Sequence, residues 1–159
     1  MSTIYSTIED EISARLAAEA WEKVDVLPVP EREKDLKLPV PNIQLIVQYA
    51  GSKFGGTKTT NPVSQEETGH FNVILQSKKL RGTTGIYDLL IKIKKSLLGF
   101  KPTGCQKLQI VPDKGIEFVE FSDDLWQFSI TLSTTWVTVE FVPDVEDEVL
   151  ITQLNLKEV

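Results

Sequence analysis

Apolar residues near the N-terminus recur at every fourth position, which is the spacing of one face of an α-helix. Ile4, Ile8, Ile12 and Leu16 follow this rule, so the pattern predicts an amphipathic helix over residues 2–21. Ser6 and Glu9 have the spacing of a capping box, which places the start of regular helix just after Ser6. The acidic residues 9–11 then lie near the positive end of the helix dipole, and this explains them better than a catalytic role does.

Strict alternation of apolar and polar residues predicts strands in much of the remaining chain. The predicted strands cover residues 43–49, 70–78, 115–121, 125–142 and 149–156. In the fourth of these, apolar residues occupy even positions before Thr134 and odd positions at Val137, Val139 and Phe141. Since successive side chains of a strand point to opposite faces, this change predicts a bulge or a second half that buries its other face against something else.

Two irregular segments separate the first elements. Residues 26–42 contain Leu-Pro-Val-Pro twice, and because proline disfavours helix at itself and at the preceding residue, we expect an extended connector. Residues 50–69 are rich in glycine and threonine and predict a long polar loop, made locally basic by Lys53 and Lys58 beside Phe54. Loops of this length are usually functional or disordered. An arm that orders against a partner and a merely mobile loop both stay open.

The segment from Arg81 to Pro102 contains two glycines before a second predicted helix. Gly85 is followed by Ile86 and not by lysine, so the segment is not a phosphate-binding P-loop. Its main apolar stripe, which we expect to pack on the sheet, consists of Ile86, Leu89, Leu90, Ile93 and Leu97. A second stripe is formed by Tyr87, Ile91 and Leu98.

The second stripe needs a covering surface of its own. That surface is either the first helix of the same chain or a neighbouring subunit. The first interpretation is favoured for a soluble monomer, in which exposed apolar stripes are costly.

The element order of helix, two strands, helix and three strands predicts a single domain over residues 1–159. Without strand–helix alternation, the fold class is α+β with a mostly antiparallel sheet of four or more strands. The formal net charge of −6 argues against broad attraction to nucleic acid and to anionic membranes. A single cysteine and the absence of an apolar leader or a long apolar run predict a soluble protein of a reducing cytoplasm.

Residues with catalytic potential are few and dispersed. His70 is the only histidine and starts a predicted strand, so we expect a solvated edge residue. Cys105 lies near Lys101 and Lys107, which can lower its pKa, but no histidine is close in sequence. The carboxylates lack metal-loop spacing. The sequence therefore predicts no catalytic, cofactor-binding or metal-binding residues.

The pattern as a whole resembles the Mu-type phage family of tail terminator, or tail-completion, proteins. The resemblance rests on a short N-terminal helix, a strand pair, the segment "LRGTTGIYDLLIKIKKSLLGFKP" and the aromatic strand "LWQFSITLSTTW". The motif residues are Arg81, Gly82, Gly85, Tyr87, Leu98, Gly99 and Pro102. The proline-rich connector and the segment 50–69 have no match in the family pattern.

This resemblance implies two helices packed on one face of a mostly antiparallel sheet, and a non-enzymatic structural role. Proteins of that family form a hexameric ring on the last ring of tail tube subunits, stop tube and sheath growth, and present a docking face to the neck of the head. Partners would be copies of the chain, the tail tube protein, the sheath protein and a neck or head-completion protein. The location would be the head-proximal end of the virion tail after assembly in the host cytoplasm. DNA would only pass through the lumen, where an acidic surface repels phosphates.

Candidate contact residues follow from these considerations. The candidate subunit interface comprises Tyr87, Ile91, Leu98, Val137, Val139 and Phe141, and the candidate partner-contacting loop comprises Lys53, Phe54 and Lys58. Two other function classes are weighed against the ring protein. One is a nucleic-acid-binding accessory protein using Lys78, Lys79, Arg81, Lys92 and Lys95, and the other is a small enzyme using Cys105 or His70.

Overall fold

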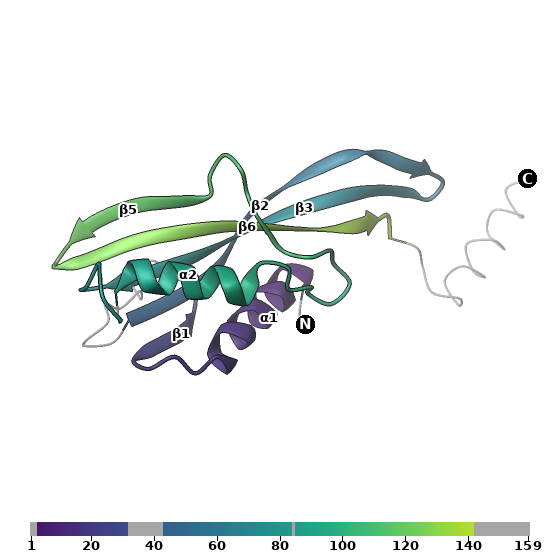
Figure 1. The fold of residues 1–159 in the computed structure, drawn as a ribbon. Coiled ribbons are helices and arrows are strands. Elements are labelled where there is room, and N and C mark those ends of the chain that lie inside the picture. The colour runs from purple at the N-terminus through teal and green to yellow at the C-terminus, as the bar shows by residue number, and fades with distance from the viewer. Residues whose placement is uncertain (1–2, 32–42, 84, 142–159) are drawn as a thin grey trace, which may run out of the picture.

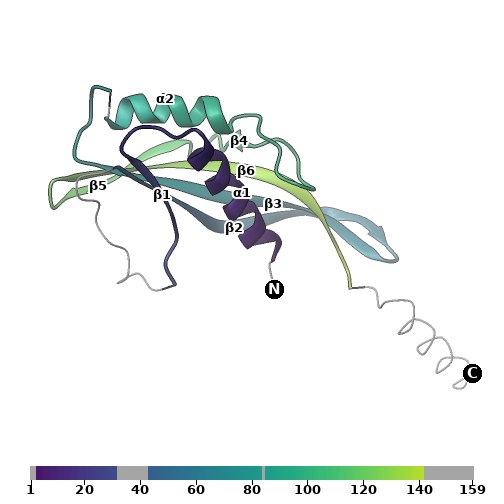
Figure 2. The same ribbon diagram turned by 90° about the horizontal axis from the view of Figure 1, so that it is seen from below.

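The computed structural model describes residues 3–31, 43–83 and 85–141. Two helices, α1 (Ile4–Ala18) and α2 (Ile86–Leu97), lie on one face of a sheet (Figures 1 and 2). The strands of the sheet are β1 (Val24–Pro28), β2 (Ile43–Thr60), β3 (Val63–Ser77), β4 (Gln109–Ile110), β5 (Ile116–Ser122) and β6 (Leu125–Val139). The predicted α+β class, with two helices on one face of a mostly antiparallel sheet, is confirmed.

The sheet has the order β1-β2-β3-β6-β4, and β5 pairs with the part of β6 that β4 leaves free. Only β1 and β2 are parallel; the other pairs are antiparallel. α1 packs mainly over β1 and β2, and α2 packs over β3 and β6. The far end of the sheet, at β5, therefore lies beyond α2.

The core fills the space between the helices and the sheet. α1 contributes Ile8, Ile12 and Leu16, which are at most 1% exposed. The main stripe of α2 is buried as predicted, at Ile86, Leu89, Leu90, Ile93 and Leu97. Alternate strand residues complete the layer, namely Leu45, Val47, Phe71, Val73, Leu75, Ile130 and Leu132. Burying side chains of this size contributes about 1.5–3 kcal/mol each, which fixes the helices on this face.

The N-terminus of α1 differs from the prediction. Thr3, not Ser6, is the N-cap: its hydroxyl accepts a hydrogen bond from the Ser6 backbone N–H, and the Ser6 hydroxyl accepts one from the Thr3 N–H. Glu9 is thereby free for a long-range contact, and its carboxylate accepts a hydrogen bond from the Tyr49 backbone N–H at 2.7 Å.

The predicted long polar loop at residues 50–69 is wrong, because most of it is strand. β2 runs on to Thr60, a short turn follows, and β3 starts at Val63 (Figure 1). Pairing overrides the polar composition: β3 is flanked by β2 on one side and by β6 on the other, so its backbone groups bond on both edges. Register shifts after Tyr49 and Phe54 absorb the glycines of this segment.

The proline-rich connector at residues 26–42 is described only in part. Extended backbone is confirmed at Leu27 and Pro28, which belong to β1 and add a parallel edge strand to β2. Residues 32–42, with the second tetrad, and the predicted strand at 149–156 lie outside the described residues.

The change of apolar parity in β6 occurs without a bulge against β3. The register between these strands is continuous from Ser64–Val139 to Ser77–Trp126. Val137 and Val139 therefore lie on the face of the sheet opposite the helices, while Trp136 lies on the helix face. The predicted bulge is therefore absent from this pairing, and the burial of the other face against something else stays a prediction, because Val137 and Val139 are about half exposed.

Candidate interaction surfaces

The second apolar stripe of α2 is exposed. Tyr87, Ile91 and Leu98, here called the outer flank of α2, are 43%, 51% and 54% exposed. The opposite flank faces α1, because the Ser96 hydroxyl donates to the Glu19 carboxylate at 2.9 Å and Arg15 Nε donates to the Ser96 carbonyl at 3.2 Å. At about 100° per residue Ile91 lies roughly 140° from Ser96 around the helix. The expectation that α1 covers the second stripe is thus wrong, because α1 contacts the flank of α2 that carries Ser96.

A second exposed apolar surface lies at the β5 end of the sheet. Phe118 and Phe121 of β5 contact Phe128 and Trp126 of β6, with ring centroids 5.5 Å apart for Phe118–Phe128 and 4.5 Å for Phe121–Trp126. A register shift between Phe118 and Glu120 places both β5 rings on the same face. Phe118 pairs with Phe128, which is two residues from the core residue Ile130 and therefore points to the same face of β6. All four rings thus lie on the helix face of the sheet, and we call them the aromatic edge.

Sequence reasoning identified β5 as a strand but missed this surface. Phe118 and Phe121 remain 55% and 50% exposed, because α2 covers β3 and β6 and leaves β5 open. The available signal was the three-residue spacing of Phe118 and Phe121. In a regular strand this spacing would place the two rings on opposite faces, so it is compatible with a shared aromatic surface only if the strand contains a bulge.

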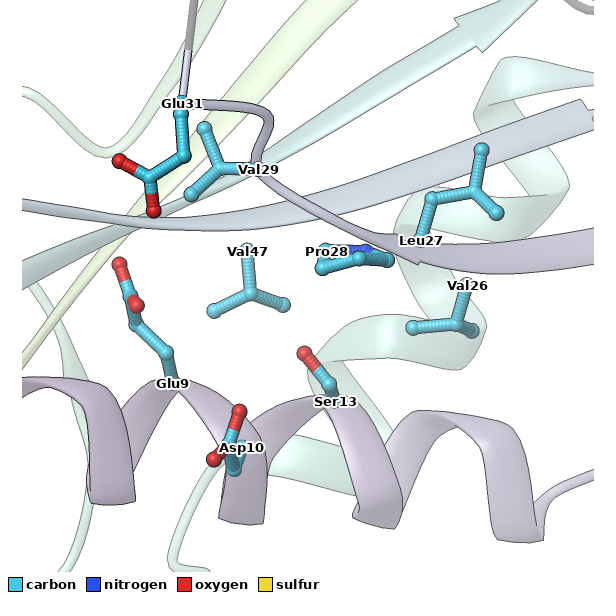
Figure 3. A pocket seen from close by; sticks show the side chains of 9 residues that line it. All are labelled: Glu9, Asp10, Ser13, Val26, Leu27, Pro28, Val29, Glu31 and Val47. Carbon is cyan, nitrogen blue, oxygen red and sulfur yellow. The ribbon is translucent and has the colours of Figure 1, made fainter. Parts of the chain in front are cut away.

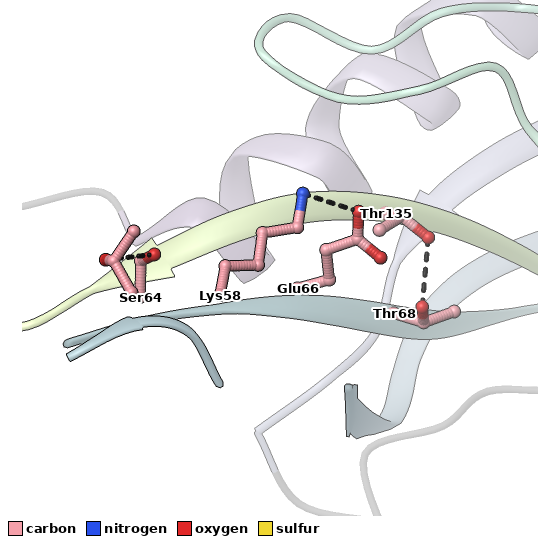
Figure 4. Close-up of polar contacts among 6 residues, drawn as sticks. Lys58, Ser64, Glu66, Thr68 and Thr135 are labelled. Atoms are coloured by element: carbon pink, nitrogen blue, oxygen red, sulfur yellow. Dashed lines mark hydrogen bonds and ion pairs between the residues drawn. The ribbon is translucent and has the colours of Figure 1, made fainter. Parts of the chain in front are cut away.

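The extended end of the sheet forms an arm beyond the helices, made of residues 50–69 of β2 and β3 and residues 134–139 of β6 (Figure 1). Polar side chains join its strands (Figure 4). Lys58 Nζ lies 2.8 Å from a Glu66 carboxylate oxygen, the Thr68 and Thr135 hydroxyls are 2.9 Å apart, and Thr59 and Ser64 are linked at 2.8 Å. These cross-strand contacts allow a polar sequence to form strands.

A buried carboxylate holds the base of the arm. Glu67 is only 2% exposed. It accepts hydrogen bonds from the hydroxyls of Tyr5 at 2.9 Å, Ser52 at 2.7 Å and Thr138 at 2.6 Å. The network therefore ties α1, β2, β3 and β6 together, and nothing in the sequence pattern pointed to it.

The network also shifts two ionisation equilibria. Burial acts to raise the pKa of Glu67, but the donors around its carboxylate outweigh burial and leave that pKa below its usual value. The hydrogen bond to Glu67, together with burial, raises the pKa of Tyr5 to about 12. Glu67 is therefore an anion at neutral pH, and the dipoles of three hydroxyl groups stabilise its charge.

The predicted partner-contacting residues all lie on β2 and do not share one face. Lys53 pairs with Thr68 and Phe54 pairs with Glu67, so they point to opposite sides of the arm. Phe54 is 54% exposed on the helix face. Lys58 lies with Glu66, whose partner in β6 is Val137, on the helix-free face.

The predicted interface residues of β6 are exposed on that helix-free face or just beyond it. Val137 and Val139 are 50% and 49% exposed, and Phe141 directly after the strand is 85% exposed. The structure thus separates the six candidate interface residues into two groups, one on α2 and one at the end of β6.

A hollow of about 340 Å³ opens between α1 and β1 (Figure 3). Its walls carry the carboxylates of Glu9, Asp10 and Glu31 above apolar strand residues, and Glu9 is already bonded to the Tyr49 backbone. We assign no ligand to this hollow.

The two side chains considered for catalysis point to different sides of the sheet: Cys105 belongs to the core beneath the helices, whereas His70 directly precedes the core residue Phe71 in β3 and so points to the helix-free face. Cys105 is 4% exposed, and burial raises the pKa of its thiol, contrary to the expectation that lysines lower it. Burial and the charges of Lys114 and Lys53 lower the pKa of His70. Within the described part of the chain, no group of three or more His, Cys, Asp or Glu side chains is arranged to hold a metal ion. No helix in that part is long and apolar enough to span a membrane.

Comparisons with known proteins place the chain in a family. One chain of a solved structure titled "Virion of native gene transfer agent (GTA) particle" is similar at 14% identity and a TM-score of 0.49, over 86% of this chain and 100% of that one. No curated protein matched the sequence. The model of the family described as Gp37 protein matches residues 12–158, and the chain therefore belongs to the Gp37 protein family.

Proposed function

We propose that this protein is a structural component of a phage-type virion that assembles with copies of itself into a ring and acts as a tail terminator. In this role it caps the tail tube, ends tail polymerisation and offers a docking face to the neck of the head. The proposal combines the tail-terminator resemblance of residues 81–102 with the surfaces described above.

The exposed outer flank of α2 is the observation that carries the proposal. Tyr87, Ile91 and Leu98 are each about half exposed on a helix whose other apolar stripe is fully used by the core. Contiguous apolar surface of this kind is uncommon on a monomer and is typical of protein–protein contacts. Because these side chains are already about half buried, covering the rest contributes about half of the 1.5–3 kcal/mol of full burial for each, which a neighbouring subunit can supply.

The arm is the second element of the proposal. It reaches beyond the helices and carries Phe54 on one face and Val137 and Val139 on the other. Because a buried anchor at Glu67 fixes its base, the arm can project these side chains onto another subunit with little loss of conformational freedom. We assign it to contacts with the tube, sheath or neck proteins.

The assembly is tested by measuring the mass of the purified protein in solution across a range of concentrations, followed by electron microscopy for six-fold rings. We expect oligomers of the wild type and a folded monomer for Ile91→Glu. The matched control is Ile93→Glu, two residues away but 0% exposed, which should unfold the chain. A wild type that stays monomeric at all concentrations contradicts the ring, and an Ile91→Glu variant that assembles normally removes the outer flank from its interface.

A second candidate function is that of a nucleic-acid-binding accessory protein. It is favoured by a local concentration of positive charge: residues 78–101 contain seven basic side chains and one carboxylate. Two of these are partly engaged: Lys92 pairs with Asp88 at 3.0 Å, and the Arg81 guanidinium lies 5.7 Å from the centroid of the Tyr87 ring. Measurement of duplex DNA affinity separates the two functions.

A further inference from the structure

The last part of β6 is a sheet edge. The Gln106 N–H donates to the Thr135 carbonyl at 2.9 Å, so the odd-numbered residues of β6 direct their backbone groups away from β3. By the same parity, Val137 and Val139 present N–H and carbonyl groups on the outer side of the strand. β4 pairs with β6 only before Thr135, and no other described strand pairs with residues 136–139 on that side. We call residues 136–139 the open edge.

The open edge lacks the features by which sheet edges usually avoid pairing with another chain, namely charged residues, prolines and bulges. The outermost strand β1 contains Asp25 and Pro28. The arm part of β2 contains two lysines and several register shifts, and β5 contains two glutamates and a register shift. The open edge reads Trp-Val-Thr-Val and pairs with β3 in a continuous register. Among the described edges it is therefore the one best suited to accept a further strand.

A hollow of about 380 Å³ lies beside the open edge. Thr135, Trp136 and Val137 line one side of it, and residues of the 101–106 loop line the other. Successive side chains of a strand point to opposite faces, so a strand added to the edge can place one side chain in this hollow. The site thus offers both backbone groups and room for a side chain.

The chain leaves the sheet at the tip of the arm. The Glu140 N–H donates to the Val63 carbonyl at 2.9 Å, and the Glu140 carboxylate accepts a hydrogen bond from the Val63 N–H at 2.6 Å. These bonds hold the chain against β3 beyond the end of β6, which points away from the helices (Figure 1). Residues 142–159 continue from there, so they start at a point where a neighbouring copy is easier to reach than the body of their own chain.

The part of the chain after the described residues has the composition of a strand that fits this edge. Residues 149–156, Val-Leu-Ile-Thr-Gln-Leu-Asn-Leu, lack glycine and proline and were predicted as a strand. The family match includes them, because it runs to residue 158. Residues 144–148 hold four carboxylates, whereas the hollow is lined by Lys58 and Lys101 against one carboxylate. Residues 142–148 can span about 25 Å when extended, which is enough to cross to a neighbour.

We propose that residues 149–156 of one copy pair as an additional strand with the open edge of a second copy. The inference rests on the proposed self-assembly and names a contact that performs it. Each copy has one such segment and one open edge, so the contact is head-to-tail, which is the type of interface that generates rings. Main-chain hydrogen bonds supply the affinity, and the hollow contributes specificity for one side chain.

Proline variants of the full-length chain test the contact. Val137→Pro removes an outward N–H of the open edge and leaves the bonds to β3 in place, and Ile151→Pro disrupts the added strand. We expect each variant alone to associate at least about tenfold more weakly than the wild type. In an equimolar mixture, the intact segment of Val137→Pro pairs with the intact edge of Ile151→Pro. The mixture should therefore form dimers with one chain of each kind, but no larger oligomers.

Analytical ultracentrifugation measures association, and circular dichroism with thermal unfolding checks that each variant is folded. Val137→Ala retains the N–H, and Lys157→Pro places the proline after the added strand, so both controls should assemble as the wild type does. If Val137→Pro does not fold, Val139→Pro replaces it, because its N–H also points outward. Ile151→Pro tests the segment independently of any change in the edge.

The outcomes separate this contact from the proposed function. If the wild type assembles and either folded proline variant assembles equally well, the pairing is wrong while self-assembly stands. If both variants stay monomeric and their mixture does too, the segment does not pair with a second copy, and the inference is again wrong. If the wild type itself never assembles, the proposed function fails.

Discussion

Trp136 packs directly against Gly69 on the helix face of the sheet. A Cβ atom added to Gly69 would lie 2.4 Å from Cη2 of Trp136 and 3.1 Å from Cε2 of Phe71. The Trp136 ring in turn makes an edge contact with Tyr5 at 6.0 Å between centroids. The absence of a side chain at one strand position thus lets an aromatic ring cover the base of the arm.

Substitution of this glycine tests the packing. Gly69→Ala should destabilise the fold by about 1–3 kcal/mol, because the added methyl group overlaps the Trp136 ring. Gly56→Ala is the matched control on the same arm, since nothing lies within 4 Å of its Cβ position. Urea unfolding of both variants gives the comparison. Equal midpoints for the two would show that the Trp136 ring moves aside without cost.

The ionisation of Glu67 makes the free energy of unfolding depend on pH in the acid range. Its pKa is lower in the folded protein than the ordinary value of 4.5, so the folded state holds the proton less tightly than the unfolded chain does. The resulting stability is complete above about pH 4.5 and is lost as pH falls through the folded pKa. Glu67→Gln should lower the free energy of unfolding at pH 7 by about 1–3 kcal/mol and flatten this acid dependence.

Urea midpoints between pH 7 and pH 3 measure the effect of Glu67. The neighbouring Glu66→Gln is the control, because Glu66 is an arm residue whose ion pair with Lys58 is about half exposed and contributes little. An acid profile of Glu67→Gln identical to that of the wild type would exclude Glu67 as its source.

The same network also shifts the ionisation of Tyr5 to higher pH, which can be measured. Because the hydrogen bond to Glu67 raises the pKa of Tyr5 to about 12, its phenol stays protonated in the folded protein where an unfolded tyrosine, at about 10, ionises. The stability that this adds is present below pH 10 and is lost as pH rises through the folded value. Ultraviolet titration should therefore show one late-ionising tyrosine, absent from Tyr5→Phe; a wild-type curve without it contradicts the assignment.

The sequence predicts those elements whose own side chains determine their structure. The stripe of α2 from Ile86 to Leu97 and the alternation of Phe71, Val73 and Leu75 identify a helix and a strand directly, because each buries a face of matching period. Their order was enough for the fold class.

Sequence patterns do not predict those elements whose structure is determined by pairing with distant segments of the chain. Residues 50–60 are strand because β3 bonds to them, and β3 is held in turn by β6, a relation between segments some seventy residues apart. Glu67 and Trp136 are joined to Tyr5 in the same way. For the candidate interface, helical periodicity identified the exposed flank at Ile91, but the aromatic edge depends on a register shift in β5 that no local pattern reveals.

Cys105 tests the enzyme interpretation. Its side chain is 4% exposed, and its Sγ donates to the Thr103 carbonyl at 3.5 Å. Because burial raises the pKa of the thiol, little thiolate forms near neutral pH. We expect slow reaction with a thiol reagent at pH 8 and rapid reaction after unfolding in urea. Fast modification of the folded protein would mark Cys105 as a reactive nucleophile.

Duplex DNA binding decides between the two candidate functions. If the five residues of the candidate patch, Lys78, Lys79, Arg81, Lys92 and Lys95, each bind a phosphate, we expect a slope of about −4.5 in a plot of log affinity against log salt concentration. Arg81→Glu/Lys95→Glu should lower the affinity and make this slope shallower. The ring protein predicts no saturable binding of a short duplex near physiological salt, because the net charge of −6 repels the phosphates. Fluorescence anisotropy at several salt concentrations, with the oligomeric state recorded in parallel, gives the answer: tight, salt-sensitive binding by a protein that stays monomeric would favour the accessory protein over the ring.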